Sequence, residues 1–508
     1  MSTLPMNQGA VPLGGPATAV AAGQYHSVVL LVDGSMRAFG HGSDGRLGYG
    51  ASGNVGDKPS TLPSLQGGVN LGGEAVAVAA GTSHTLVAMA DGKLFAFGYG
   101  ADGRLGSGST DIIGNTPQTL PLSMGPVSLG GNAVAVAAGG AHSLVLLEDG
   151  SVLAFGAGGQ GRLGYGSTSN VGDTPQTVPS AQGAVPLGGN AVAVAAGGAH
   201  SLVLLEDGSV LAFGAGGQGR LGYGSTSNVG DKPQTVPSAQ GAVPLGGNAV
   251  VVAAGSFHSL VVLNDGSVLA FGEGITGSLG YGSISNVGDT PQTAPSAQDP
   301  VPLGGKAVAV AAAPMHSLVM LEDGTARAFG NGGYGKLGYG DSSNVGDKPE
   351  TLPSKKGPVP LVAPSPTPSP SPTQSPSATP SSSVTASPSP TLTTSPTPTA
   401  SPTASGAATG NIGTSDDGAQ PADDGGVSAF VVVGAVAGAA LLLGGAAWAM
   451  KQVGLGRRSG RSAPSAAGPA SAGAAAVQQA GSGEALAVGG ASGLSSIGVQ
   501  SPASGSRV

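Results

Sequence analysis

Six histidines recur in the N-terminal part of the chain at a constant spacing, and each is followed by serine or threonine. A histidine beside a hydroxyl could activate a nucleophile, and a set of histidines could bind a metal ion. No acidic residue recurs beside the pair, and a metal ion needs several ligands in a tight geometry. We therefore predict structural hydrogen bonds here, and neither catalysis nor metal binding. The six residues, each 58 positions from the next, are His26, His84, His142, His200, His258 and His316.

The glycine-rich segment GGQGRLGYG (158–166) has features of a phosphate-binding loop and of a calcium-binding glycine repeat. It lacks the Gly-Lys-Ser/Thr ending of the first, and Leu163 stands where the second has aspartate. The chain also has no Gly-x-Ser-x-Gly motif, no His-Glu-x-x-His motif and no cysteine. The sequence therefore predicts a protein that is not an enzyme and that carries no cofactor.

The histidines belong to a longer repeat, because residues 132–189 return at 190–247 with Thr174 replaced by Lys232 as the one change. Within a copy, 133–139, 144–147 and 152–155 are short apolar runs, and Asp149-Gly150 separates the last two. Asp-Gly is a strong hairpin signal with positive φ at both turn positions. Apolar residues at consecutive positions predict burial on both sheet faces. With QTVPSA (176–181) as an outer edge strand, each copy is expected to form an antiparallel sheet of about four strands.

Small sheets repeated radially form a β-propeller, so the predicted fold class is all-β. The segment AAGGAHSLVLLEDGSVLAFGAGGQGRLGYG (137–166) resembles the regulator of chromosome condensation (RCC1) repeat family, and the resemblance covers roughly residues 3–361. It implies a propeller, typically of seven blades. The copies depart from the family in having Phe in place of Trp, and Arg46, Arg104, Arg162 and Arg220 in place of Gln. The matching positions are Gly139, His142, Ser143, Gly150, Phe155, Gly156, Leu163, Gly164 and Gly166.

The number of blades is open from the sequence. Six repeat cores begin near residues 16, 74, 132, 190, 248 and 306, whereas residues 3–15 match the end of a unit, 177–189. This end piece either completes a six-bladed ring by strand exchange or belongs to a seventh blade. Because 1–10 also has no features of a signal peptide, we expect that the natural start lies upstream and encodes a signal peptide and the rest of a blade.

Composition divides the chain into a repeat domain (1–363), a stalk (364–426), an apolar run (427–450) and a tail (451–508). The repeat domain carries 14 basic and 22 acidic residues, a poor match for nucleic acid. The Pro/Ser/Thr-rich stalk is expected to be disordered and extended, and open to O-glycosylation. The run of 24 uncharged residues predicts one transmembrane helix. Acidic residues before it and Lys451, Arg457, Arg458 and Arg461 after it predict an extracellular propeller and a disordered cytoplasmic tail.

Variation among the copies is the best guide to a binding site, because residues common to all copies serve the architecture. The loop before the second strand and the loop after the third are expected at the same end of the sheet. Both are plain in copies three and four and distinctive in the other four, which would be contiguous in a closed ring. The candidate binding residues are Tyr25, His41, Asp44, Tyr99, Asp102, Phe257, Glu273, Ile275, Met315, Tyr334 and Lys336. The alternative is that these differences are drift after duplication of copies three and four.

The leading functional hypothesis is a membrane-anchored, non-enzymatic protein that presents a propeller on a stalk for protein or glycan recognition. The resemblance also implies guanine-nucleotide exchange on a small GTPase. Against that alternative stand the acidic propeller, the uniform copies and the predicted outward topology. A third hypothesis is an inhibitor of a secreted enzyme, because some bacterial relatives bind a β-lactamase through one propeller face.

Overall fold

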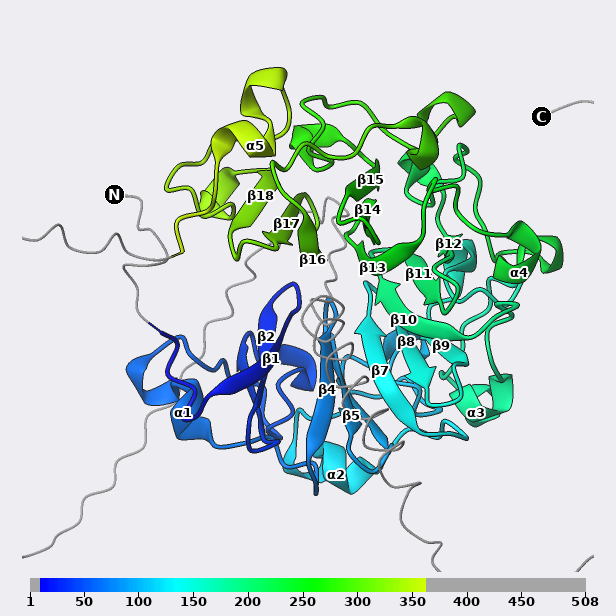
Figure 1. Cartoon of the computed structure of the whole chain (residues 1–508). Helices are drawn as coiled ribbons and strands as arrows, with labels where there is room; N and C mark the ends of the chain where they lie inside the picture. Colours follow the sequence, from blue (N-terminus) through cyan, green and yellow to red (C-terminus); the bar gives the residue numbers. More distant parts are fainter. Residues whose placement is uncertain (1–9, 362–508) are drawn as a thin grey trace, which may run out of the picture. The chain divides into compact units, whose positions relative to one another are not determined.

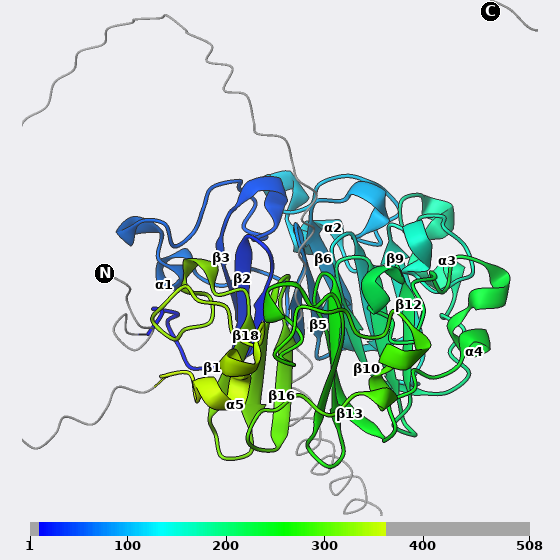
Figure 2. The ribbon, with the colours of Figure 1, turned by 90° about the horizontal axis from the view of Figure 1, so that it is seen from above.

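The computed structural model describes residues 10–361, which form six three-stranded antiparallel sheets arranged around a central axis (Figure 1). The first strand of each sheet is the innermost, and the short helices lie at the outer ends of the sheets (Figures 1 and 2). The predicted stalk, transmembrane helix and tail lie outside the described residues. Within 10–361 no helix is long and apolar enough to cross a bilayer.

Each sheet consists of three consecutive strands with the middle strand paired to both others. The sheets are β1 (Ala17–Ala22), β2 (His26–Leu31), β3 (Met36–Gly40); β4 (Ala75–Ala80), β5 (His84–Met89), β6 (Leu94–Gly98); β7 (Ala133–Ala138), β8 (His142–Leu147), β9 (Val152–Gly156); β10 (Ala191–Ala196), β11 (His200–Leu205), β12 (Val210–Gly214); β13 (Ala249–Ala254), β14 (His258–Leu263), β15 (Val268–Gly272); β16 (Ala307–Ala312), β17 (His316–Leu321), β18 (Ala326–Gly330).

The Asp-Gly turns join the second and third strands as predicted, but their geometry differs from the prediction. Only the glycine has positive φ, +81° at Gly150. The amide of Gly150 donates to the Leu147 carbonyl at 3.0 Å, and the amide of Leu147 donates to the Ser151 carbonyl at 2.9 Å. Asp149 instead accepts from the amide and hydroxyl of Ser151, at 2.9 and 2.6 Å. This is the longer hairpin loop with a left-handed glycine at its end.

The predicted fourth strand at 176–181 is wrong. That segment forms a 3₁₀ turn (Pro175–Thr177) followed by α3 (Pro179–Gln182). A proline at the start of each turn sets φ for a helix and removes an amide that a strand would need. Contact with the sheet is limited to residues on either side of this segment. Val171 forms an isolated antiparallel bridge with Gly156, and the Val185 amide donates to the Val152 carbonyl at 2.8 Å. The corresponding helices are α1 (Pro63–Gln66), α2 (Pro121–Met124), α4 (Pro237–Gln240) and α5 (Pro353–Lys356), with a 3₁₀ turn at Pro295–Ala297 in the fifth copy.

Successive sheets stack face to face, which explains the runs of consecutive apolar residues. All six residues of β8 are buried, as are all five of β9. The stacking fully buries a phenylalanine of the third strand in the second to sixth copies, such as Phe155 against the Gly106 of the preceding copy, whereas Phe39 of the first copy is half-buried. Burial on both sheet faces is therefore confirmed. The sixth and first sheets, in contrast, leave the apolar faces that they turn toward one another partly exposed.

Candidate functional site

Five of the six repeated histidines, all except His316, connect neighbouring sheets through a hydroxyl of the next sheet. The Nε2 of His142 lies 2.9 Å from the Ser201 hydroxyl of the next sheet, and that hydroxyl donates to the Arg162 carbonyl at 2.8 Å. Thr85 takes the same part between the first two sheets, 2.8 Å from His26 Nε2 and 2.8 Å from the Arg46 carbonyl. The hydroxyl therefore bridges two groups of the preceding sheet.

Burial holds these imidazoles in the neutral form. It lowers the pKa of His26 to about 3, helped by the charge of Arg46. The pKa of His142 lies well below its usual range for the same reason, with a smaller effect of Arg162. Neither histidine faces a carboxylate that could orient it as a base. The described residues contain no group of three or more His, Cys, Asp or Glu that could hold a metal ion.

The loops that vary between copies lie together at one end of each sheet. The amide of His41 donates to the Tyr25 carbonyl at 2.9 Å, and the rings of the two residues are 6.1 Å apart, edge to face. The same backbone bond joins Glu273 to Phe257 at 2.9 Å. The expected juxtaposition of the two loops is therefore present within single copies.

The loop after each third strand contains a 3₁₀ turn whose second residue has positive φ although it is not glycine. Asp44, Asp102 and Tyr334 occupy this position, with φ of 58°, 59° and 61°. Backbone in this region is strained for residues other than glycine. The Tyr334 side chain is fully exposed. The turns are Ser43–Gly45, Ala101–Gly103, Gly159–Gly161, Gly217–Gly219, Ile275–Gly277 and Gly333–Gly335.

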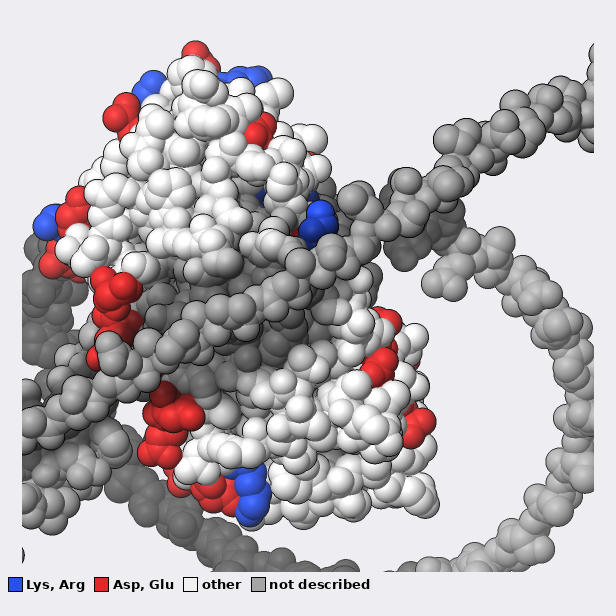
Figure 3. Space-filling model, turned by 90° about the vertical axis from the view of Figure 1, so that its right-hand side faces the viewer, with Lys and Arg blue, Asp and Glu red and all other residues white. Residues whose placement is uncertain are grey.

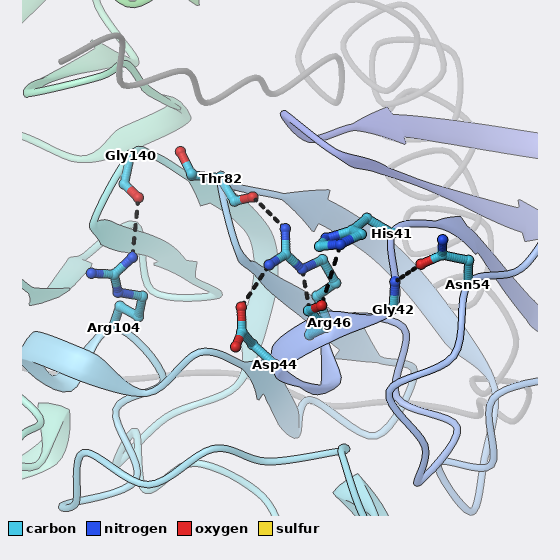
Figure 4. Close-up of polar contacts among 9 residues, drawn as sticks. His41, Gly42, Asp44, Arg46, Asn54, Thr82, Arg104 and Gly140 are labelled. Carbon is cyan, nitrogen blue, oxygen red and sulfur yellow. Dashed lines mark hydrogen bonds and ion pairs between the residues drawn. The ribbon is translucent and has the colours of Figure 1, made fainter. Parts of the chain in front are cut away.

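Three of the loop arginines, Arg46, Arg104 and Arg220, lie against aromatic rings, a contact that the sequence did not reveal. Arg46 is buried, and its guanidinium bonds Asp44 at 2.7 Å and the Thr82 carbonyl of the next sheet at 3.4 Å (Figure 4). The same guanidinium lies 5.7 Å from the centre of the Tyr25 ring. The sequence signal for this contact was the recurrence of an arginine at the same position of a loop that has few other charged residues.

Equivalent cation–aromatic pairs occur in the other distinctive copies. Arg104 lies 5.1 Å from the Tyr99 ring and 2.9 Å from Asp102, and its guanidinium also bonds the Gly140 carbonyl at 3.4 Å (Figure 4). Arg220 of the fourth copy lies 4.9 Å from the ring of Phe257 in the fifth. Distances below about 6 Å are favourable for such pairs. Each aromatic ring is thereby held against a fixed charge.

The fifth and sixth copies add charged residues next to their aromatic residues: Glu273 pairs through its backbone with Phe257, and Lys336 lies in the same loop as Tyr334. Partial burial raises the pKa of Glu273, against the opposing effect of Arg220. Lys336 lies 6.0 Å from the Tyr334 ring of its own loop. Ile275 and Met315, from the same two copies, are also exposed. This region therefore combines apolar, aromatic and charged groups.

The candidate residues form two groups, because the sixth and first sheets do not stack. The first group is defined as Tyr25, His41, Asp44, Tyr99 and Asp102, on the first and second sheets. In a closed ring these residues would lie on one arc of four neighbouring sheets. The opening between the sixth and first sheets divides that arc (Figure 1). The second group is defined as Phe257, Glu273, Ile275, Met315, Tyr334 and Lys336, on the fifth and sixth sheets.

Sequence comparison matches the chain to the Regulator of chromosome condensation (RCC1) repeat at 33–88, 91–146, 149–204 and 207–262. A second model of the same repeat matches 17–46, 75–104, 133–162, 191–220 and 250–275. The chain belongs to the RCC1 repeat family. The first-strand, hairpin and glycine-rich segments described above are thus family features, and the six sheets are its blades.

Three relatives illustrate the range of the family. The mouse E3 ubiquitin-protein ligase HERC2 is 34% identical over 315 residues, which are 61% of this chain and 6% of that protein. Human WBSCR16 has a TM-score of 0.50 at 19% identity, over 66% of this chain and 81% of that one. Yeast Prp20p, described with binding properties to Gsp1p and histones, has a TM-score of 0.48 at 22% identity, over 65% and 75%. The chain thus spans a small part of HERC2, and the likeness to the WBSCR16 structure supports the fold alone.

Proposed function

We propose that this RCC1-type propeller is a non-enzymatic binding protein that recognises a protein or glycan ligand through the two groups of loop residues. The observation that carries the proposal is that exposed aromatic rings are fixed on buried arginines, as Tyr99 is on Arg104 at 5.1 Å. Rings that are already ordered lose little conformational entropy on binding. Tyrosines of this kind supply large contact areas together with a polar hydroxyl.

The third and fourth copies offer an internal reference for this proposal. At the position of Tyr99 they have Ala157 and Ala215, and at the position of Tyr334 they have Gln160 and Gln218. Their backbone has the same turn, with φ of 61° at Gln160. A ligand that needs the aromatic rings therefore has no equivalent contacts on these two blades.

We also propose that the propeller is presented outside the cell, on the Pro/Ser/Thr-rich stalk, by the apolar run at 427–450. Support comes from the sequence: 24 uncharged residues are long enough for one membrane span, and basic residues follow them. The face drawn in Figure 3 suits a partner without a phosphate backbone, because it is mostly uncharged, with scattered acidic side chains and fewer basic ones.

Site-specific photocrosslinking on intact host cells tests the binding site. A photoreactive phenylalanine analogue at Tyr99 or Tyr334 should capture a ligand, whereas the same analogue at Ala157 or Gln160 should not. Glycosidase treatment of the captured species separates a glycan from a protein ligand. Equal capture at Gln160 and Tyr334 would refute recognition by the loop groups.

Protease shaving of the same cells tests the topology separately. Trypsin added outside should release propeller fragments from intact cells. Complete protection until the cells are lysed would contradict the extracellular proposal, and would direct the search toward internal proteins such as a small GTPase.

A further inference from the structure

The first strand of each sheet contains a β-bulge near its start. In β7 the Cα partners are Ala133 with Leu147 and Ala135 with Leu146, so Val134 is the extra residue. The same shift of register occurs in the other five first strands. A bulge redirects the side chain of the extra residue out of the regular alternation of the strand. The bulge residue therefore need not pack between two neighbouring sheets.

In five of the six copies the bulge residue is a valine that remains exposed. Val134 is 39% exposed, whereas Val136, two residues farther along the same strand, is 1% exposed. The first strands are the innermost of the propeller (Figure 1), and consecutive first strands are in contact. The exposed valines therefore lie beside the central space, at the end where the first strands begin. We call them the valine row: Val76, Val134, Val192, Val250 and Val308.

The valine row lies at the end of the propeller opposite to the two groups of loop residues. The amide of Glu148, which follows β8, donates to the carbonyl of Asn132, which precedes β7, at 2.9 Å. The start of the first strand thus lies beside the Asp149-Gly150 hairpin turn. The loop that joins the first and second strands lies at the other end of the sheet. The valine row is therefore separate from the binding site proposed above.

Carboxylates lie beside the middle of the valine row. Glu74 lies two residues before Val76 on the same strand, a separation of about 7 Å. Within 10–361, Lys93 is the one cation paired with any of these carboxylates, at 2.6 Å from Asp91. The second, third and fourth copies supply six exposed acidic residues next to the first strand or in the hairpin turn: Glu74, Asp91, Glu148, Asp149, Glu206 and Asp207.

Hydrogen bonds keep the carboxylates of the hairpin turns ionised. Ser151 donates its hydroxyl and its amide to Asp149 at 2.6 and 2.9 Å, and these bonds lower the pKa of Asp149. A bond from the Lys93 ammonium likewise lowers the pKa of Asp91. The surface beside the valine row therefore carries negative charge at neutral pH.

A hollow at the same end of the propeller fits a cationic side chain. It has a volume of about 300 Å³ and lies between the hairpin turn of the first copy and the segment that leads into β4. Asp33 and Glu74 line it, and none of the described residues around it is Lys or Arg. The corresponding hollow of the fifth copy, of about 360 Å³, is lined by both Asp265 and Lys306. The negative charge is therefore concentrated on the first four copies.

We propose that the valine row and the carboxylates beside it form a second docking surface, which binds a basic amphipathic segment of a partner protein. The apolar side chains of that segment cover the valines, and its Lys or Arg side chains pair with Glu74, Glu148 and Glu206. The same carboxylates repel a phosphate backbone and an anionic membrane surface. The third and fourth copies, whose loops are plain at the other end, contribute to binding at this one.

Three synthetic peptides test the chemistry of the partner on the full-length chain. A fluorescein-labelled peptide of Leu and Lys, with Leu at every third or fourth position, should bind, and fluorescence anisotropy gives its affinity. Matched peptides with Glu in place of Lys, or Ser in place of Leu, should bind at least about tenfold more weakly. Added salt should weaken binding of the Leu/Lys peptide. Equal binding of the Leu/Glu peptide, or no binding of the Leu/Lys peptide, would overturn the proposal.

Two double substitutions locate the binding surface. Val134→Ser with Val192→Ser should weaken binding of the Leu/Lys peptide about tenfold, because two apolar contacts are lost. Glu148→Gln with Glu206→Gln should weaken it about fivefold and reduce its dependence on salt. All four side chains are exposed, so the melting temperature should change little.

Matched controls remove similar side chains elsewhere. Ile284→Ser removes an exposed apolar side chain next to Gly274, at the loop end of the fifth copy. Glu350→Gln removes an exposed carboxylate of the outer 3₁₀ turn Pro349–Thr351. Neither control should change the affinity, and losses equal to those of the site variants would overturn the proposal. Tyr99→Ala should also leave peptide binding intact. A loss with Tyr99→Ala and none with the valine variant would assign the peptide to the loop groups instead.

Discussion

Replacing Ser201 by alanine tests whether the histidine–hydroxyl junctions hold the blades together. The Ser201 hydroxyl lies 2.9 Å from His142 Nε2 and donates to the Arg162 carbonyl at 2.8 Å, and His142 is completely buried. The substitution keeps Cβ and leaves only a small cavity. Its main effect is to leave two buried polar groups without their partner.

The expected loss follows from those two groups. A buried donor or acceptor that loses its partner costs about 1–3 kcal/mol, so we expect a loss of about 3 kcal/mol in the free energy of unfolding. With an unfolding entropy of about 2.1 cal/mol/K per residue over about 350 residues, this lowers the melting temperature by about 4 °C.

The matched controls are present in the chain. Ser27 makes neither contact with the described residues, so Ser27→Ala should change the melting temperature by less than about 1 °C. Ser201→Thr should be tolerated, because Thr85 makes both contacts in the second copy. Thermal unfolding of the full-length variants by circular dichroism gives the comparison. Equal effects of Ser27→Ala and Ser201→Ala would refute the role of the junction.

Further expectations concern pH and the glycines. Burial lowers the pKa of His26 and His258 to about 3, whereas a histidine in the unfolded chain titrates near about 6.5. Below that pH the unfolded state therefore binds more protons than the folded state. For each such histidine, the free energy of unfolding falls by up to about 1.4 kcal/mol per pH unit. Melting temperatures should fall steeply from pH 6.5 to 4.5, and a flat profile would contradict burial of neutral imidazoles. Gly161→Ala places Cβ 2.2 Å from the Asp231 amide at φ +80°, and should cost about 3–5 kcal/mol in urea unfolding. Gly183→Ala has the same φ but open space, and should cost only about 1–2 kcal/mol; similar losses at both sites would contradict the close contact.

The repeat period, the strands and the hairpins could be predicted from the sequence because each depends on neighbouring residues. The Asp149-Gly150 turn and the apolar runs around it are local signals. The prediction of a fourth strand was wrong. The segment lies in a β-rich repeat, but Pro175 and Pro179 each start a helical turn. Turn type also depends on loop length, which the dipeptide alone does not give.

Contacts between neighbouring copies could not be predicted from the sequence. Whether His316 finds a hydroxyl depends on what lies beside the sixth sheet, and nothing in the residue itself distinguishes it from His258. Ala313, where the other five copies have glycine, is a local difference beside this histidine. Similarly, the loop arginines looked like departures from a family pattern, whereas their contacts with aromatic rings and with a carbonyl of the next sheet exist only in the folded arrangement.

The junction between blades is directional, with a histidine on one face of each sheet and a hydroxyl on the other. Contacts of this head-to-tail kind are heterologous and can continue without limit until the rotation closes. A 58-residue unit can therefore be copied in the gene and its product can stack on the original without any new complementary surface. The third and fourth copies, which differ only at the exposed positions of Thr174 and Lys232, fit such an origin. Gain or loss of whole units by recombination is then tolerated by folding, and the number of blades is limited by geometry around the axis.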